Sequence, residues 1–178
     1  MSDTLVRPRL RLRPTMLSDL DFVITVETDA LNLPFITPWE RTQHEAAIRF
    51  PDFRHFIIEG GEGLDAVGFL ILIGCKSPHQ SLELKRMVVR DKGRGFGRAA
   101  LRVAKKVAFD DLGAHRFWLD VRTNNPRAKS LYDGEGFVIE GVLREAVRSG
   151  GGFESLVVMS MLKSEFVQRR GVALEAAA

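Results

Sequence analysis

The chain has 178 residues, enough for one domain that buries about two-thirds of its unfolded surface without disulfides or metals. Its composition is 45% hydrophobic and 28% charged, as in ordinary soluble globular proteins, and its formal net charge is +3. Arginines and lysines are scattered along the sequence and do not form blocks, which argues against nucleic-acid binding. We expect a single domain over residues 1–178.

The sequence predicts no membrane segment and no intramolecular disulfide. No apolar run approaches the roughly 20 residues that span a bilayer, and Met1–Thr4 lacks the apolar core of a secretory signal. Cys75 is the single cysteine. The four histidines show no metal-ligand spacing, so no metal site is expected. These features predict a cytoplasmic protein.

The chain opens with a predicted strand and helix. Leucine alternates with arginine over residues 7–13, which indicates an edge strand with one solvated face. Ser18 and Asp19 are suited to cap a helix whose apolar residues recur at helical spacing as far as Leu31. The helix is expected to end before Pro34, because the residue preceding a proline disfavours helical geometry.

The next segments alternate between short apolar runs and turns. A second helix is predicted over about residues 40–50. The runs 55–59 and 66–75 flank a glycine-rich spacer, residues 60–63, and this arrangement predicts an antiparallel pair. A further strand is predicted over residues 82–89.

The second half of the chain predicts alternating helices and strands. A helix over residues 96–110 has Phe96, Ala100, Val103 and Val107 on one face, and Gly113 ends it. The order of elements implies a mixed sheet flanked by helices. The remaining predicted elements are a strand at 115–121, a helix at 125–135, and strands at 137–143 and 153–162.

Residues 92–98, here called the glycine loop, read Lys-Gly-Arg-Gly-Phe-Gly-Arg between the strand ending at Val89 and the helix beginning at Phe96. Glycines at alternate positions let the backbone turn sharply and bring several N–H groups within reach of one ligand. The start of the helix adds the positive end of its dipole. The glycine loop is therefore predicted to hold a phosphate or pyrophosphate.

A second motif lies about thirty residues downstream. Asn125, Ala128, Leu131 and Tyr132 fall at the spacing Asn-x-x-Ala-x-x-Leu-Tyr, and Gly136-Phe137 follows. Together with the glycine loop, this motif resembles the GNAT acetyltransferase superfamily, which carries an Arg/Gln-x-x-Gly-x-Gly/Ala loop before it.

The register of that first family motif can be placed in two ways. Lys92-x-x-Gly95-x-Gly97 is preferred because helix follows Gly97 directly, although lysine replaces the usual arginine or glutamine. The overlapping register Arg90-x-x-Gly93-x-Gly95 fits the pattern literally, so the two alternatives differ by two residues.

Weaker similarities extend the resemblance across most of the chain. Residues 10–14 with 19–21, Pro38-Trp39 and residues 140–144 resemble the branch containing ribosomal-protein alanine N-acetyltransferases. The resemblance implies an α/β (α+β) fold with a mixed, mostly antiparallel sheet of six to seven strands, splayed at the coenzyme site, and about four helices. It implies acetyl-CoA as co-substrate and a primary amine as acceptor, either a protein N-terminal α-amine or a small amine. A homodimer is left open.

The resemblance also implies catalytic roles. Tyr132, the single tyrosine, occupies the position that protonates the departing sulfur, since a phenol remains protonated at neutral pH. Its alternative role is a core-edge aromatic whose hydroxyl meets a backbone carbonyl. Glu83 is the candidate general base, although Leu82 and Leu84 flank it and simple alternation would turn it toward solvent.

Coenzyme contacts are expected from the strand before the glycine loop, from the loop itself and from Asn125, which also suits a helix cap before Pro126. Arg98 is open to a second interpretation, as part of an exposed cationic row with Arg102 and Lys105. The acceptor groove is expected from residues 31–41 and 149–153. The predicted coenzyme-binding residues are Met87, Val88, Val89, Lys92, Gly93, Arg94, Gly95, Phe96, Gly97, Arg98 and Asn125.

Three alternatives remain open from sequence. A GNAT-shaped module could bind acyl-CoA and catalyse nothing. A dinucleotide-binding protein is the second alternative, because Gly95-x-Gly97-x-x-Ala100 fits the glycine fingerprint and Asp120 follows twenty residues after Ala100. Cys75 could carry the acyl group covalently, although a small buried hydrophobe is its simpler role.

Overall fold

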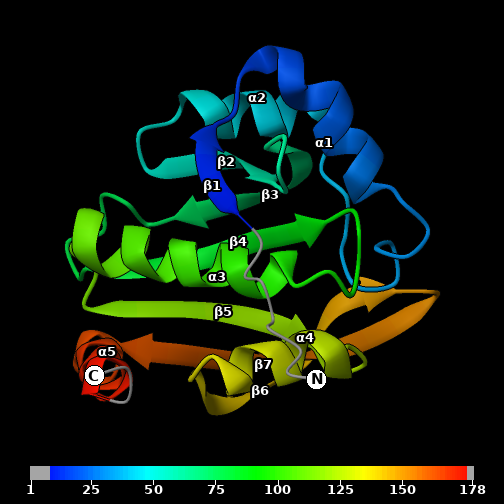
Figure 1. Ribbon diagram of the computed structural model, residues 1–178. Helices are drawn as coiled ribbons and strands as arrows, with labels where there is room; N and C mark the ends of the chain where they lie inside the picture. The colour runs from blue at the N-terminus through cyan, green and yellow to red at the C-terminus, as the bar shows by residue number, and fades with distance from the viewer. Residues whose placement is uncertain (1–8, 176–178) are drawn as a thin grey trace, which may run out of the picture.

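The computed structural model describes residues 9–175, where seven strands form one sheet flanked by five α-helices (Figure 1). The predicted strand positions 7 and 8 lie outside the described residues. The strands are β1 (Leu10–Pro14), β2 (Phe53–Gly60), β3 (Asp65–Ile73), β4 (Ser81–Val89), β5 (Arg116–Arg122), β6 (Val138–Ser149) and β7 (Gly152–Leu162). The helices are α1 (Leu20–Glu27), α2 (Arg41–Arg49), α3 (Phe96–Lys106), α4 (Pro126–Gly134) and α5 (Lys163–Glu175), with a 3-10 turn at Leu17–Asp19 and a π turn at Val107–Asp111.

The sheet has the strand order β1-β2-β3-β4-β5-β7-β6, and every neighbouring pair is antiparallel except β4 and β5. These two strands pair only over Ser81–Glu83 and Arg116–Trp118. Beyond that point they separate toward their C-terminal ends (Figure 1). The predicted mixed, mostly antiparallel and splayed sheet is confirmed. The dinucleotide alternative is wrong, because it requires a doubly wound parallel sheet.

Helices cover both faces of the sheet, and neighbouring strand residues alternate between the two layers. Ile57 is fully buried in the cluster that includes Leu20 and Val23 of α1, whereas Ile58 is fully buried in the cluster that includes Ala100 of α3. This alternation follows from the two-residue period of a β-strand. The central strands therefore contribute buried apolar side chains to the cores on both faces of the sheet.

The first helix is shorter than predicted. α1 ends at Glu27, and Leu31 is an exposed residue of the following turn. The Thr28 hydroxyl donates to the Ile24 carbonyl at 2.7 Å, and the Asp29 carboxylate accepts from the Leu31 N–H at 2.8 Å. Such local side-chain bonds compete with helix propagation, and so the apolar spacing that continued to Leu31 was misleading.

The C-terminal helix α5 was not predicted, so the sheet carries five α-helices and not about four. α5 packs through Phe166, whose ring stacks on Phe109 with centroids 4.8 Å apart. Over residues 9–175, no helix has the length and apolar character that crossing a membrane requires.

Candidate functional site

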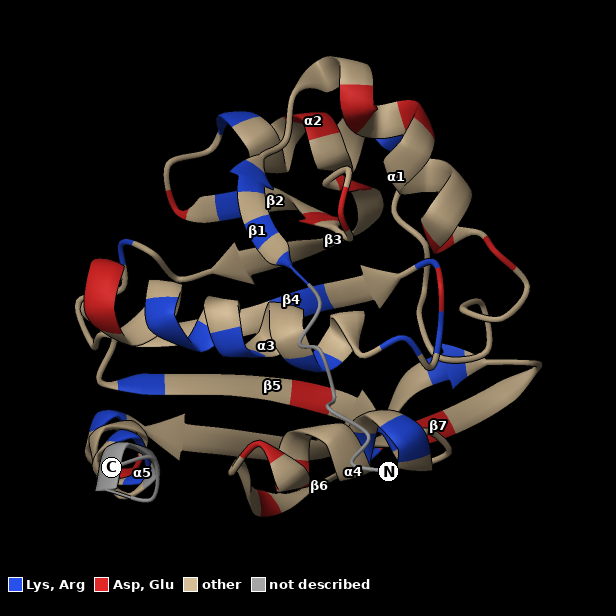
Figure 2. Ribbon diagram, in the orientation of Figure 1, with Lys and Arg blue, Asp and Glu red and all other residues tan. Residues whose placement is uncertain are grey.

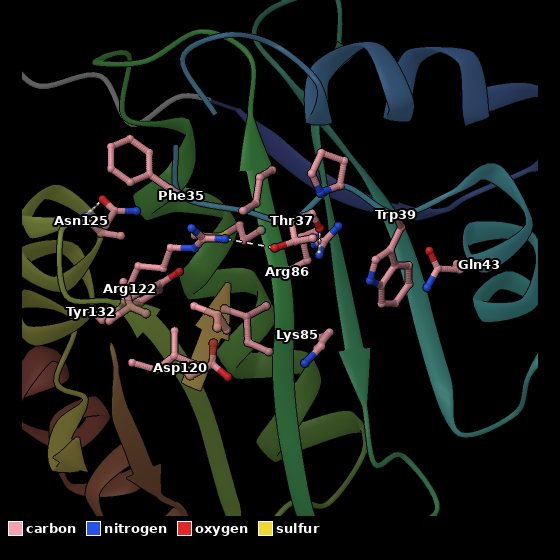
Figure 3. Close-up of a pocket in the computed structure, with 18 residues that line it drawn as sticks. Phe35, Thr37, Trp39, Gln43, Lys85, Arg86, Asp120, Arg122, Asn125 and Tyr132 are labelled. Atoms are coloured by element: carbon pink, nitrogen blue, oxygen red, sulfur yellow. Dashed lines mark hydrogen bonds between the residues drawn. The ribbon is translucent and has the colours of Figure 1, made fainter. Parts of the chain in front are cut away.

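A pocket of about 520 Å³ opens where β4 and β5 separate (Figure 3). Its walls combine segments that are far apart in sequence, because the splayed strands form the floor and the connection between α1 and α2 crosses above them. The residues that line it include Leu84–Met87 of β4, Asp120–Arg122 of β5, Asn125, Ala128 and Tyr132 at α4, Phe35–Trp39 between α1 and α2, Gln43, Val147 and Leu156.

The glycine loop has the geometry of an anion cradle. Gly93 and Gly95 both adopt φ of +80°, a left-handed conformation that side chains disfavour. The first backbone hydrogen bond of α3 runs from Ala99 N to Gly95 O at 3.0 Å, so the N–H groups of Phe96, Gly97 and Arg98 have no acceptor within the helix. Gly95 is the helix cap in this arrangement. The open N–H groups and the helix dipole together favour a bound anion.

The cations of the glycine loop have different environments. Lys92 is half-buried, and its ammonium donates to the Asn32 side-chain carbonyl and, at 2.6 Å, to the Val89 carbonyl. Burial lowers the pKa of Lys92. Arg94 is exposed and lies over the Phe96 ring, 5.2 Å from its centroid. Of these two cations, Arg94 is therefore the one that is accessible to a phosphate, while Lys92 fastens the loop to the end of β4.

Arg98, Arg102 and Lys105 all converge on Glu135 at the end of α4, at N–O distances of 2.8, 2.9 and 3.0 Å. Glu135 and Lys105 are buried. The interpretation of these cations as an exposed row is therefore wrong for Lys105, although Figure 2 shows basic residues along α3. Burial acts to raise the pKa of Glu135, but hydrogen bonds from Arg102 and Lys105 outweigh it and lower the pKa. The cluster joins α3 to α4.

Asn125 and Tyr132 lie on the pocket side of α4. The Asn125 side-chain oxygen accepts from Ala128 N at 3.1 Å, which confirms the predicted helix cap. Tyr132 is 8% exposed. Its hydroxyl has no hydrogen-bond partner among the described residues, and the hydroxyl oxygen keeps some exposure to solvent. The alternative of a hydroxyl bonded to a backbone carbonyl is thus not observed. Burial, followed by the nearby charge of Asp120, raises the pKa of Tyr132 to about 12.

The two candidate carboxylates differ in position. Glu83 lies opposite Trp118, where β4 and β5 are still paired, and its carboxylate is 3.1 Å from Lys85 Nζ. It is not among the residues that line the pocket. Asp120 does line the pocket and has no ion-pair partner in the part of the chain that the structure describes. Alternation along the strand predicts that Asp120 faces away from Leu119 and Val121, which are buried. It does not predict that a pocket opens beside Asp120.

A buried row of hydrogen-bonded polar side chains, which no pattern in the sequence indicates, also reaches the pocket. His55 Nδ1 lies 2.9 Å from Thr15 Oγ1, and His55 Nε2 lies 3.1 Å from His44 Nδ1. His44 Nε2 lies 3.0 Å from the fully buried Glu27, which also bonds Arg86. Burial lowers the pKa of His44 to about 4, and burial together with the repulsion that a protonated His44 would exert lowers the pKa of His55 to about 3. Both histidines are therefore neutral hydrogen-bonding groups.

Cys75 lies outside the pocket, just after β3, and packs against the main core. Burial raises the pKa of its thiol. A thiol with a raised pKa is a poor nucleophile at neutral pH, so this environment does not favour a covalent acyl carrier.

The chain is similar in sequence and in structure to known acetyltransferases. A family profile described as "Acetyltransferase (GNAT) domain" matches residues 9–138. A spermidine N(1)-acetyltransferase of Vibrio cholerae is 31% identical over 117 residues, which cover 65% of this chain and 67% of the relative, and one of Escherichia coli K12 is 22% identical over 170 residues, covering 89% and 88%. The crystal structure of the Vibrio cholerae enzyme with CoA and spermine has a TM-score of 0.80 and 26% identity, covering 89% of this chain and 98% of that one.

Proposed function

Because the chain belongs to the GNAT acetyltransferase family, we propose that it transfers an acetyl group from acetyl-CoA directly to a primary amine. The pocket at the splayed ends of β4 and β5, flanked by the glycine loop and α4, is the observation that carries this proposal. Small amines are the first candidates for the acceptor, since relatives of this chain acetylate spermidine. A protein N-terminal α-amine, implied by the resemblance to the ribosomal-protein branch, is the second candidate.

The coenzyme is proposed to bind mainly through backbone N–H groups. Among residues 9–175, no strand pairs with the β5-side edge of β4 beyond Glu83, so we propose that the main chain at Met87–Val89 pairs with the pantetheine arm. Val88, Val89 and Phe96 have buried side chains and contribute only their backbone. The diphosphate is placed on the N–H groups of residues 93–98, with Arg94 beside it and the Asn125 amide facing the pocket.

The reaction needs a neutral amine and a protonated leaving group. We assign Asp120, in place of the predicted Glu83, as the carboxylate that takes one proton from the acceptor ammonium and so yields the neutral amine that attacks, because Asp120 faces the pocket. The neutral nitrogen then forms a bond to the acetyl carbon while the carbon–sulfur bond breaks, and the nitrogen loses a second proton, which restores the Tyr132 hydroxyl after Tyr132 has protonated the sulfur. Tyr132 gives its hydroxyl proton to the departing thiolate, and its raised pKa keeps that proton available at neutral pH.

The test is thiol release by purified protein supplied with acetyl-CoA and a panel containing spermidine, other small primary amines and peptides with free N-termini. Amine-dependent release, with the acetylated amine identified by mass spectrometry, is the expected result. Tight binding of acetyl-CoA without amine-dependent release across the panel would instead identify the non-catalytic acyl-CoA-binding alternative. Intersecting initial-rate patterns are expected, and parallel lines would indicate a covalent acyl-enzyme.

A further inference from the structure

Thr37 connects the two strands that separate at the pocket. Arg86 of β4 donates from Nη2 to the Thr37 carbonyl at 2.8 Å, and Arg122 of β5 donates from Nη2 to the Thr37 hydroxyl at 3.0 Å (Figure 3). We call these two contacts the Thr37 bridge. Because β4 and β5 no longer pair at this level, the connection between α1 and α2 spans the gap through one residue.

Both arginines are themselves fixed in place. Arg86 bonds the fully buried Glu27 and lies 5.0 Å from the centroid of the Trp39 ring. Glu27 also accepts from the Trp39 backbone N–H at 3.1 Å, and the buried histidine chain supports its carboxylate. With 8% of its side chain exposed, Arg86 is held by a carboxylate and a loop, and it is not free to bind an anionic substrate.

Arg122 is held from the opposite direction. Its Nη1 lies 3.0 Å from Ser149 Oγ and 3.2 Å from the Glu154 carboxylate, both in the β6–β7 hairpin. Its side chain is likewise 8% exposed. Arg122 therefore joins Thr37 to Ser149, and these residues belong to the two segments, 31–41 and 149–153, that the sequence predicted as the acceptor groove.

From this geometry we infer that the Thr37 bridge positions the acceptor amine. The inference rests on the proposed function and deepens it by assigning Arg86 and Arg122 as positioning residues that act through Thr37. The bridge fixes the wall formed by residues 35–39 relative to Asp120, whereas no residue of the glycine loop, which is proposed to hold the coenzyme diphosphate, lines this pocket. Loss of the bridge is therefore expected to weaken use of the amine and to spare binding of acetyl-CoA.

Thr37→Val tests the bridge because it removes the hydroxyl and keeps the side-chain volume and the carbonyl. The KM for the amine is expected to rise about five- to tenfold, since a hydrogen bond to a charged donor is lost. The KM for acetyl-CoA and the melting temperature are expected to stay unchanged. Thr37→Ser keeps the hydroxyl and should restore the KM for the amine. Thr25→Val, on the exposed face of α1, is the matched control.

Hydrogen–deuterium exchange of residues 33–40 gives a second readout that needs no turnover. Faster exchange in Thr37→Val, restored in Thr37→Ser, is expected. Unchanged exchange would overturn the bridge even if the protein is an active acetyltransferase. A wild-type protein without amine-dependent turnover would overturn the proposed function and with it the positioning role. An equal rise in both KM values would overturn the assignment of the bridge to the acceptor.

Discussion

Asp120 and Tyr132 line the same pocket, and the negative charge of Asp120 adds to burial in raising the pKa of Tyr132 to about 12. A carboxylate beside a phenol makes the phenolate unfavourable, so Tyr132 keeps its proton at neutral pH. Tyr132 is neutral and can donate a proton, while Asp120 offers the carboxylate that we propose as proton acceptor. This division of roles matches the demands of amine acetylation.

The electrostatic link predicts a measurable change in titration. In Asp120→Asn, the pKa of Tyr132 should fall below about 12, because the nearby negative charge is gone while burial remains. Tyr132 is the single tyrosine, so phenolate absorbance reports this group alone. Glu83→Gln is the matched control and should leave the titration unchanged. An unchanged titration curve in Asp120→Asn would show that Asp120 does not affect the pKa of Tyr132.

Removal of the proposed proton donor, the Tyr132 hydroxyl, should lower the rate of acetyl transfer and leave folding intact. Tyr132→Phe is expected to lower kcat about 100-fold or more, the usual contribution of a general acid. The ring is buried and the hydroxyl has no partner among residues 9–175, so the melting temperature should change little. Steady-state kinetics and thermal unfolding check both points. Full activity in this variant would mean that water or another group protonates the sulfur.

The two carboxylates can be distinguished by rate. Asp120→Asn is expected to reduce kcat/KM about 100-fold, whereas Glu83→Gln should change it only a few-fold, since Glu83 bonds Lys85 and does not line the pocket. The pH dependence of kcat/KM for both variants provides the measurement. A larger loss in Glu83→Gln would return the base role to the residue that the sequence suggested.

The histidine chain predicts acid sensitivity. The pKa values of His44 and His55, about 4 and 3, lie below the ordinary value of 6.5, so the unfolded chain binds protons that the folded chain does not. Their contribution is complete above about pH 6.5 and is lost as the pH falls toward about 4 for His44 and about 3 for His55, by up to about 1.4 kcal/mol per pH unit for each group.

Urea unfolding between pH 4 and pH 7, on the order of one experiment per half unit, measures this slope. His44→Gln should flatten it, whatever its effect on stability at neutral pH. The exposed His79 serves as control, and His79→Gln should keep the wild-type slope. If the free energy of unfolding of His44→Gln fell with pH as steeply as that of the wild type, His44 would not be a source of the acid sensitivity.

The Glu135 cluster predicts a large effect on stability. Glu135→Gln should cost about 3 kcal/mol, because Lys105 then remains buried without a counter-charge. Lys105→Met in the same background should recover part of the loss, since it removes the remaining buried charge. Asp110→Asn, which breaks an exposed pair with Arg170, should cost less than about 1 kcal/mol. Denaturant unfolding compares the three variants.

Features encoded by neighbouring residues were predictable from the sequence. The glycine loop follows a strand and caps α3, and Asn125 with Pro126 begins α4, because turn and cap chemistry depends on residues close in the chain. Helix α5 was missed because its sequence carries only weak apolar periodicity and includes Gly171. Its packing is decided by the contact of Phe166 with Phe109.

The remaining site features depend on long-range contacts. Glu27 and Arg86, which form an ion pair, are 59 residues apart in the sequence, and Arg122 and Thr37, which form a hydrogen bond, are 85 residues apart. Helix and strand periodicity cannot predict contacts at such separations. The sequence alone places Lys105 among several surface cations, whereas in the fold it is buried against Glu135. The sequence pointed to Asp120 only as the acidic residue of the dinucleotide alternative, since its place at the pocket depends on where β5 leaves β4.

Amide hydrogen–deuterium exchange with and without CoA tests most directly whether the coenzyme occupies the separation of β4 and β5. Slower exchange is predicted at residues 84–89 and at the glycine loop, with no change at the hairpin tip, residues 150–152. Protection confined to other segments, or none at saturating CoA, would contradict the proposed site.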